Sequence, residues 1–266
     1  MFEIILLAII QGITEFIPVS SSGHLILFPS IFGSNDQGLY IDIAFHFGSL
    51  LAVLIYFKKD LAFIFSDWVN SLVGKSQATE ENGKTGWALI VATIPIVLIG
   101  YFLFELIENQ FRSATVIAYA MIGFGILLGL VDLKSDKKKL FSDIKLLDAF
   151  LIGLAQVLAL IPGTSRSGIT ITAGLALGFT REAASRFSFL LAIPTISGAF
   201  ILIVSADVLS NGISNWKSFV SAAAMSAFFS YYSIYYFLRL IERIGMWPFV
   251  LYRVMLGFLI LFLIYK

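Results

Sequence analysis

The sequence predicts an all-α integral membrane protein with six transmembrane helices and two re-entrant helical hairpins in an inverted-topology repeat. Hydrophobic residues make up 59% of the chain, charged residues only 13%, and the mean hydropathy is +0.92, whereas soluble domains carry about 25% charged residues. The apolar runs are long and continuous rather than alternating, which favours transmembrane helices over a β-barrel. Polar blocks containing proline and glycine interrupt two of these runs in similar ways, which indicates two related halves.

Six apolar runs are long enough to cross a hydrocarbon core of roughly 30 Å. They lie at 40–57, 87–107, 115–132, 184–204, 217–238 and 247–265. Two further apolar regions, 1–30 and 146–178, are broken midway by Pro18 and Gly23 and by Pro162, Gly163 and Gly168. A break at membrane depth is tolerated only where it is packed in protein or lines an aqueous cavity. Each region is therefore predicted to be a helix–break–helix hairpin that returns to its own side.

The distribution of positive charge orients the bundle, because cytoplasmic loops carry the excess of Lys and Arg. One side holds Lys58, Lys59, Lys75, Lys84, Lys134, Lys137, Lys138, Lys139, Lys145, Arg181, Arg239 and Arg243. The other side holds Arg112, Lys217 and Lys266. The first set is predicted to be cytoplasmic, with 58–86 as a cytoplasmic excursion. Both termini and the mouth of the first hairpin are then extracytoplasmic.

An internal repeat relates the two halves. At one constant offset, the residues Gln11, Ser20, Ser22 and Gly23 align with Gln156, Ser165, Ser167 and Gly168. Each half contains three full spans, an odd number, so the halves must have opposite orientations. The chain is therefore predicted to be one membrane domain of two inverted repeats, 1–133 and 146–266, joined by a cytoplasmic Lys-rich loop at 134–145. In such proteins the functional site lies where the broken helices meet near the midplane.

Polar and ionisable side chains in these breaks are the candidate functional groups, because a charge at the bilayer centre costs roughly 2.5–3.5 kcal/mol even on the most lenient scale. Glu15 could instead be an interfacial cap, and His24 a packed histidine. The hydroxyls of 20–22 could serve only to satisfy backbone groups freed by the break. A purely structural role fits Arg166 least well, because an always-charged guanidinium beside a helix break requires an anion such as phosphate.

Composition excludes other chemistries. The chain has no cysteine, which rules out disulfides, thiol catalysis and Cys-ligated zinc. The net charge of +1 gives no support for nucleic acid as a partner. A bilayer is the expected environment, and a homodimer is left open.

The block Q-G-x-T-E-F-x-P-V-S-S-S-G-H-L at 11–25, with P-G-T-S-R-S-G at 162–168 and F-S-F-L-L-A-I-P at 187–194, resembles the bacterial undecaprenyl-diphosphate phosphatase family of the bacitracin-resistance type. The resemblance covers the whole chain. It implies a bacterial inner-membrane hydrolase that converts undecaprenyl diphosphate to undecaprenyl phosphate and inorganic phosphate, recycling the carrier lipid of cell-wall synthesis and giving bacitracin resistance. It also implies a divalent cation, Mg or Ca. The family's first acidic position is Gln11 here, so Glu15 must carry any acidic role in this block.

The expected site combines these residues. Arg166 would bind the diphosphate, Glu15 would hold the metal or activate a neighbour, Ser21 would be nucleophile or phosphate donor, and His24 would be general base or acid. Further substrate-binding candidates are Gln11, Ser20, Ser22, His46, Thr164, Ser165, Ser167 and Arg253. Ser21 and Arg166 are expected to lie within one phosphate group of each other, in a pocket open to the extracytoplasmic side. A phosphoenzyme and direct attack by water both remain open.

Two alternatives come from other classes. A lipid-phosphate transporter or flippase would use the same broken helices and midplane anion site. An acid-phosphatase-like lipid phosphatase is disfavoured, because it requires a catalytic His downstream of the S-R pair, and the only histidines, His24 and His46, both precede Arg166.

Overall fold

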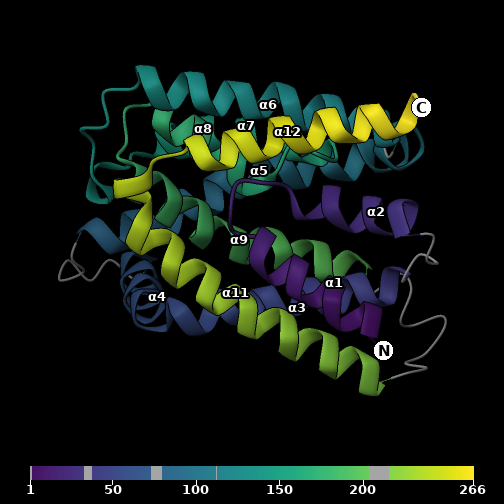
Figure 1. The fold of residues 1–266 in the computed structure, drawn as a ribbon. Helices are drawn as coiled ribbons and strands as arrows, with labels where there is room; N and C mark the ends of the chain where they lie inside the picture. Colours follow the sequence, from purple (N-terminus) through teal and green to yellow (C-terminus); the bar gives the residue numbers. More distant parts are fainter. Residues whose placement is uncertain (1, 33–37, 73–79, 112, 204–215) are drawn as a thin grey trace.

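The computed structural model describes residues 2–32, 38–72, 80–111, 113–203 and 216–266. Within these ranges the chain is a helical bundle without β-strands (Figure 1). Its helices are α1 (Phe2–Thr14), α2 (Ser21–Phe32), α3 (Leu39–Tyr56), α4 (Lys58–Leu72), α5 (Glu80–Gln110), α6 (Ala114–Lys134), α7 (Leu146–Gln156), α8 (Arg166–Ala176), α9 (Arg181–Ile203), α11 (Trp216–Ile244) and α12 (Trp247–Ile264). Short 3-10 turns at Phe141–Asp143 and Val157–Leu160 join some of them.

Several helices are long and apolar enough to cross a membrane. In the described part of the chain, four segments satisfy both conditions: Lys84–Leu103, Ala114–Lys134, Arg181–Ile201 and Trp247–Ile264. They coincide with four of the six predicted spans. The predicted span 40–57 corresponds to α3, which forms a fifth candidate only together with α4, across a bend of 78°. The predicted span 217–238 lies in α11, whose many serine and tyrosine residues lower its hydropathy.

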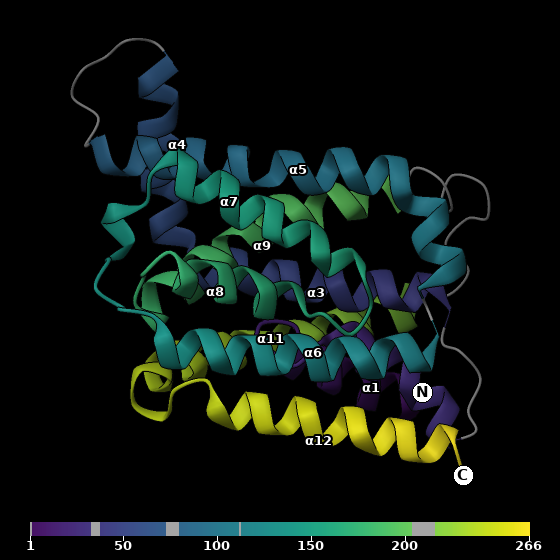
Figure 2. The same ribbon diagram turned by 90° about the horizontal axis from the view of Figure 1, so that it is seen from above.

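Both predicted hairpin regions contain a helix, a break and a second helix. The first is α1, residues 15–20 and α2, and the second is α7, residues 157–165 and α8. Figure 1 shows α1 and α2 opening toward the end of the bundle where both termini lie, and Figure 2 shows α7 and α8 opening toward the other end. The tips of the two hairpins therefore meet inside the bundle.

The helices around these hairpins pack in corresponding pairs. α1 and α3 pack on α11, α7 and α9 pack on α5, and α6 runs along α12. A Cβ atom on Gly12 would lie 2.7 Å from the carbonyl oxygen of Ser226, so glycine is required for the close approach of α1 to α11. This packing fixes the positions of both breaks.

Charged residues close the end of the bundle opposite the termini. Arg181 donates to both carboxylate oxygens of Asp132, at 2.7 and 3.0 Å, and Arg186 donates to Asp60 at 2.7 Å. The Lys-rich loop 134–145 lies at this same end (Figure 1).

Among the residues used for orientation, Lys75 and Arg112 lie outside the described residues. The predicted excursion 58–86 is occupied by α4 and the start of α5, with 73–79 outside the description.

Candidate active site

The two breaks have the same local structure. Ser20 and Ser165 have positive φ angles of 73° and 71°, and each is followed by a helix. The Ser20 hydroxyl accepts a hydrogen bond from the Gly23 amide at 3.3 Å, and the Ser165 hydroxyl accepts one from the Gly168 amide at 3.1 Å. These are N-caps, which satisfy a backbone donor that the first turn leaves free. The aligned S-x-S-G sequences therefore adopt one conformation in both halves.

The tips of the hairpins are bonded directly to each other. The Ser167 hydroxyl donates to the carbonyl oxygen of Ile17 at 3.1 Å. Gly163, at φ 92°, places its backbone so close to α6 that a Cβ would lie 2.5 Å from the carbonyl oxygen of Ile117. Only glycine fits at this point of the second break.

Arg253, on α12, connects both breaks. Its side chain is fully buried. It donates to the carbonyl oxygens of Gly163 at 3.0 Å and Thr164 at 2.8 Å, and makes a longer contact of 3.5 Å with that of Pro18. These carbonyls have lost their helical partners at the breaks, and one guanidinium carries several donors in a fixed plane. Arg253 therefore links the tips of the two hairpins through their backbone carbonyls.

The carboxylate of Glu15 is the centre of the polar cluster. Its Oε2 atom accepts hydrogen bonds from the Ser21 hydroxyl at 2.7 Å and the Gln11 amide at 2.9 Å. Its Oε1 atom lies 3.3 Å from Nη2 of Arg166, and His46 Nδ1 lies 3.7 Å from Oε2. Glu15 is 7% exposed. The expected proximity of Ser21 and Arg166 is present, because both side chains bond to this single carboxylate.

Arg166 retains binding capacity beyond this pair. Nη1 donates to the carbonyl oxygen of Ser188 at 3.1 Å, and the guanidinium lies 6.0 Å from the ring centroid of Phe16. Its Nε is buried and has no hydrogen-bond partner among the described residues, and the same holds for Oε1 of Gln11. The Arg166 Nε donor and the Gln11 Oε1 acceptor are therefore both unpaired beside Glu15, although buried polar atoms are normally paired.

His24 faces away from this cluster. Its Nδ1 atom lies 2.7 Å from the carbonyl oxygen of Ser20, and its Nε2 atom lies 2.6 Å from the hydroxyl of Tyr252 on α12. In the described part of the chain, the hydroxyl of Ser21 is bonded to Glu15 and has no bond to His24.

The structure thus divides the predicted site residues into two groups. Gln11, Glu15, Ser21, His46 and Arg166 form the cluster. The other predicted residues lie around this cluster and bond within or to the two breaks: Ser20, Ser22, His24, Thr164, Ser165, Ser167 and Arg253. Sequence reasoning missed Tyr252 and the Ser188 carbonyl, and no sequence signal singles them out.

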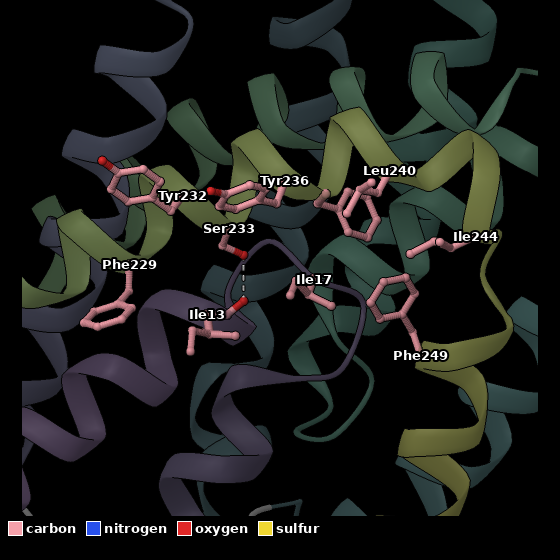
Figure 3. A pocket seen from close by; sticks show the side chains of 10 residues that line it. Ile13, Ile17, Phe229, Tyr232, Ser233, Tyr236, Leu240, Ile244 and Phe249 are labelled. Carbon is pink, nitrogen blue, oxygen red and sulfur yellow. Dashed lines mark hydrogen bonds between the residues drawn. The ribbon is translucent and has the colours of Figure 1, made fainter.

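An apolar groove lies beside the first break (Figure 3). It has a volume of about 310 Å³ and is lined by Ile13, Ile17, Phe229, Tyr232, Ser233, Tyr236, Phe237, Leu240, Ile244 and Phe249. The Ser233 hydroxyl, its one aliphatic hydroxyl, donates to the carbonyl oxygen of Ile13 at 2.8 Å. The groove therefore presents mainly carbon and aromatic surface.

Comparisons with known proteins identify the family of the chain. Residues 4–259 match the model of the family described as bacitracin resistance protein BacA. An undecaprenyl-diphosphatase of Alteromonas mediterranea is 50% identical over 100% of this chain and 99% of its own. The undecaprenyl-diphosphatases of Saccharophagus degradans (49% identical, 95% of this chain, 94% of theirs) and Teredinibacter turnerae (50%, 98% and 98%) are similarly close. The chain belongs to the BacA family of bacitracin resistance proteins.

Proposed function

We propose that this protein hydrolyses undecaprenyl diphosphate to undecaprenyl phosphate and inorganic phosphate, which recycles the carrier lipid of cell-wall synthesis. The observation that carries the proposal is the Glu15 carboxylate, shared between the hydroxyl of Ser21 and the guanidinium of Arg166. Glu15 can accept the proton of the Ser21 hydroxyl, while the guanidinium of Arg166 beside it binds the phosphate. The relatives, named undecaprenyl-diphosphatases over their whole length, support the same reaction.

The geometry supports Ser21 as nucleophile with Glu15, rather than His24, as its base. Ser21 Oγ bonds to the terminal phosphorus, and its proton moves to Glu15 Oε2, 2.7 Å away. The bond from phosphorus to the bridging oxygen breaks, and undecaprenyl phosphate leaves with that electron pair. A serine hydroxyl requires such a base to react.

Hydrolysis of the phosphoserine completes the reaction. Water attacks the phosphorus, the bond to Ser21 Oγ breaks, and that oxygen regains the proton held by Glu15. The protons of the attacking water leave on the inorganic phosphate, so the step balances with Glu15 alone. His24, whose ring nitrogens bond the Ser20 carbonyl and the Tyr252 hydroxyl, takes no direct part in it.

Positive charge for the diphosphate comes from two sources. Arg166 has an unused Nε donor beside Glu15. In addition, α2 and α8 both begin at the tips, so the N-termini of two helices meet where the anion would bind. Without substrate, the pair formed by Glu15 and Arg166 compensates two buried charges that would each be costly alone.

A divalent cation, Mg or Ca, is proposed as cofactor. No group of three or more His, Asp or Glu side chains in the described residues forms a metal cage. Mg²⁺ is usually held by one or two carboxylates together with substrate phosphates, and the oxygens of Glu15, Ser21 and the unpartnered Gln11 Oε1 fit that mode. The cation would neutralise charge on the diphosphate oxygens.

The membrane arrangement is proposed to be six spans and two re-entrant hairpins in two inverted repeats, 1–133 and 146–266. The matching breaks at Ser20 and Ser165 and the opposite entry of the two hairpins support it. The excess of Lys and Arg at the end opposite the termini supports a cytoplasmic position for that end. In the bacterial inner membrane, the site would then open to the extracytoplasmic side.

The apolar groove is proposed to receive part of the substrate's hydrocarbon chain. Ile17 lines the groove and also belongs to the first break, two residues after Glu15. The groove runs from there along α11 toward Ile244, at the end of the bundle opposite the termini. A lipid whose diphosphate enters from the extracytoplasmic side points its chain in this direction.

Phosphate release by purified protein in detergent tests the proposal, because no transport across a membrane is then possible. Glu15→Gln and Ser21→Ala should each lower turnover by about 10²–10⁴-fold, and Ser66→Ala, an exposed serine on α4 outside the site, is the control and should have little effect. Chelation of divalent cations should abolish release, and added Mg²⁺ or Ca²⁺ should restore it. Near wild-type rates in folded Ser21→Ala would contradict the nucleophile assignment.

A lipid-phosphate transporter or flippase is the second candidate. The observation that favours it is the meeting of two discontinuous helices from opposite ends, which is a common plan for transporters. Wild-type protein that releases no phosphate in detergent but exchanges lipid diphosphate between leaflets of vesicles would favour this function over hydrolysis.

A further inference from the structure

The hydrogen bonds of Gln11 define the orientation of its side-chain amide. The residue is fully buried, and its Nε2 atom lies 2.9 Å from Oε2 of Glu15. The same oxygen accepts from the Ser21 hydroxyl, and the carboxylate is paired with Arg166, so it is ionised and can only accept hydrogen bonds. The Gln11 atom that faces it must therefore be the amide nitrogen, because the carboxylate would repel the amide oxygen.

The second hydrogen of this amide goes to His46, on α3. Nδ1 of His46 lies 3.0 Å from Nε2 of Gln11. Because an amide nitrogen can only donate, Nδ1 is the acceptor, and the hydrogen of the neutral imidazole is on the other ring nitrogen. Both hydrogens of the amide are then bonded, and turning the amide over would lose both bonds.

The oxygen of the same amide is left without a partner. Oε1 of Gln11 is buried and accepts no hydrogen bond from the described residues. Gln156, the aligned residue of the second half, is also fully buried, but its oxygen accepts from the Thr195 hydroxyl at 3.2 Å and its nitrogen donates to the carbonyl oxygen of Ala92 at 3.4 Å. The second half thus satisfies both ends of its glutamine amide, whereas the first half leaves an acceptor oxygen unpaired beside Glu15.

We propose that His46 is a positioning residue of the hydrolytic reaction, which holds the Gln11 amide so that Oε1 is presented to the divalent cation. The proposal rests on the proposed function, in which that cation neutralises the diphosphate at Glu15. An amide oxygen does not attract phosphate oxygens, but it is an ordinary ligand of hard cations such as Mg²⁺ and Ca²⁺. Loss of the partner that orients a metal ligand typically costs about 10–100-fold in metal affinity or activity.

The alternative is that His46 acts through charge. A protonated imidazole 3.7 Å from Oε2 of Glu15 would balance the carboxylate without any part for the amide. Two substitutions separate these roles. In His46→Asn, the amide oxygen takes the place of Nδ1 and accepts from Gln11 without carrying a charge. In His46→Leu, a methyl group of nearly the same size takes that place and cannot accept. The His46 side chain is 38% exposed, so neither change opens a cavity in the core.

Kinetics compare the two variants. The Mg²⁺ concentration for half-maximal phosphate release should rise about 10–100-fold in His46→Leu, with little change in kcat at saturating Mg²⁺, and should stay near the wild-type value in His46→Asn. In a Gln11→Leu background, where Oε1 is gone, His46→Leu should have no further effect. Equal losses in His46→Asn and His46→Leu, or additive losses in the double variant, would overturn the proposal.

Metal binding is measured separately from turnover. Electron paramagnetic resonance of Mn²⁺, used in place of Mg²⁺, reports binding to protein saturated with a methylene-bridged polyprenyl diphosphate, whose bridge cannot be hydrolysed. The Kd of Mn²⁺ should rise about 10–100-fold in His46→Leu and not in His46→Asn. An unchanged Kd in His46→Leu would show that Oε1 of Gln11 does not bind the cation.

Nitrogen NMR of ¹⁵N-histidine protein tests the hydrogen bond without metal or substrate. The chain has 2 histidines, so a His24→Gln variant leaves the His46 signals alone. We expect an unprotonated Nδ1 whose resonance moves in Gln11→Leu, and a protonated Nδ1 would refute the assignment. Absence of phosphate release by the wild type would instead refute the proposed function, while Mn²⁺ binding and NMR would still decide the role of His46.

Discussion

Ser20 and Ser165, from opposite halves of the chain, have the same left-handed backbone and cap the helices that follow them in the same way. A positive φ is uncommon for a residue other than glycine and costs of order 1–3 kcal/mol. Its occurrence at both aligned positions indicates that the turn is required to bring the S-x-S-G segments to the tips. The serine side chain offsets part of this cost by bonding the Gly23 or Gly168 amide.

The first prediction concerns this strain. Ser165→Gly loses the cap but removes the strain, whereas Ser165→Ala loses the cap and keeps the strain. Replacement of an N-cap by glycine costs a few tenths of a kcal/mol and by alanine about 1 kcal/mol. The alanine variant should therefore be less stable than the glycine variant by about 1–3 kcal/mol, the reverse of the order in a helix interior.

Thermal unfolding in detergent of both variants, with the same pair at Ser20, measures this difference. Ser66, an exposed residue in the interior of α4, serves for comparison, since alanine should exceed glycine in stability there. Equal stability of Ser165→Ala and Ser165→Gly would mean that the backbone relaxes and that no strain is stored.

The breaks themselves were predictable from sequence. Pro18 and the Pro162–Gly163 pair interrupt apolar runs, and helix interiors tolerate neither residue well. The matching S-x-S-G segments placed Ser21 and Arg166 at equivalent points, and the structure brings both to Glu15. Sequence was sufficient here because the position of each break depends on local backbone geometry, and the two hairpins enter from opposite ends, which brings their tips together.

Contacts that depend on the packing of distant helices were not predictable. The sequence suggested His24 as general base or acid for Ser21, but the carboxylate of Glu15, in the first break, bonds Ser21 instead. Likewise, Tyr252 meets His24 only because α12 packs beside the first hairpin. Neither the direction of a side chain in a break nor the rotation of a helix follows from apolar periodicity.

The second prediction concerns Arg253, which was expected from sequence to contact phosphate. Its guanidinium is buried between backbone carbonyls of both breaks. Arg253→Met should therefore destabilise the protein by about 2–5 kcal/mol, because several buried carbonyls lose their donor. Thermal unfolding in detergent measures the change, and Arg243→Met on the exposed end of α11 is the control. A stable Arg253→Met protein with only a raised KM would show that Arg253 binds substrate instead.

The third prediction concerns orientation. Because the chain has no cysteine, single cysteines can be introduced and labelled in intact cells with a membrane-impermeant thiol reagent. Lys266→Cys, at the C-terminus, should be labelled from outside. Lys138→Cys, in the exposed part of the Lys-rich loop, should be labelled only after the cells are opened. The reverse pattern would contradict the assignment by positive charge.

The last prediction concerns the hydrocarbon chain of the substrate. Leu240 lines the groove and is 39% exposed, so Leu240→Trp fills the groove without touching the Glu15 cluster. KM for undecaprenyl diphosphate should rise about tenfold, equivalent to about 1.4 kcal/mol of lost apolar contact, while kcat stays unchanged. A short polyprenyl diphosphate that does not extend as far as Leu240 should keep its KM.

Leu259→Trp on the exposed face of α12 is the matched control, since tryptophan there also faces lipid but lies outside the groove. If Leu240→Trp and Leu259→Trp give the same KM with the long substrate, the chain follows another path out of the site.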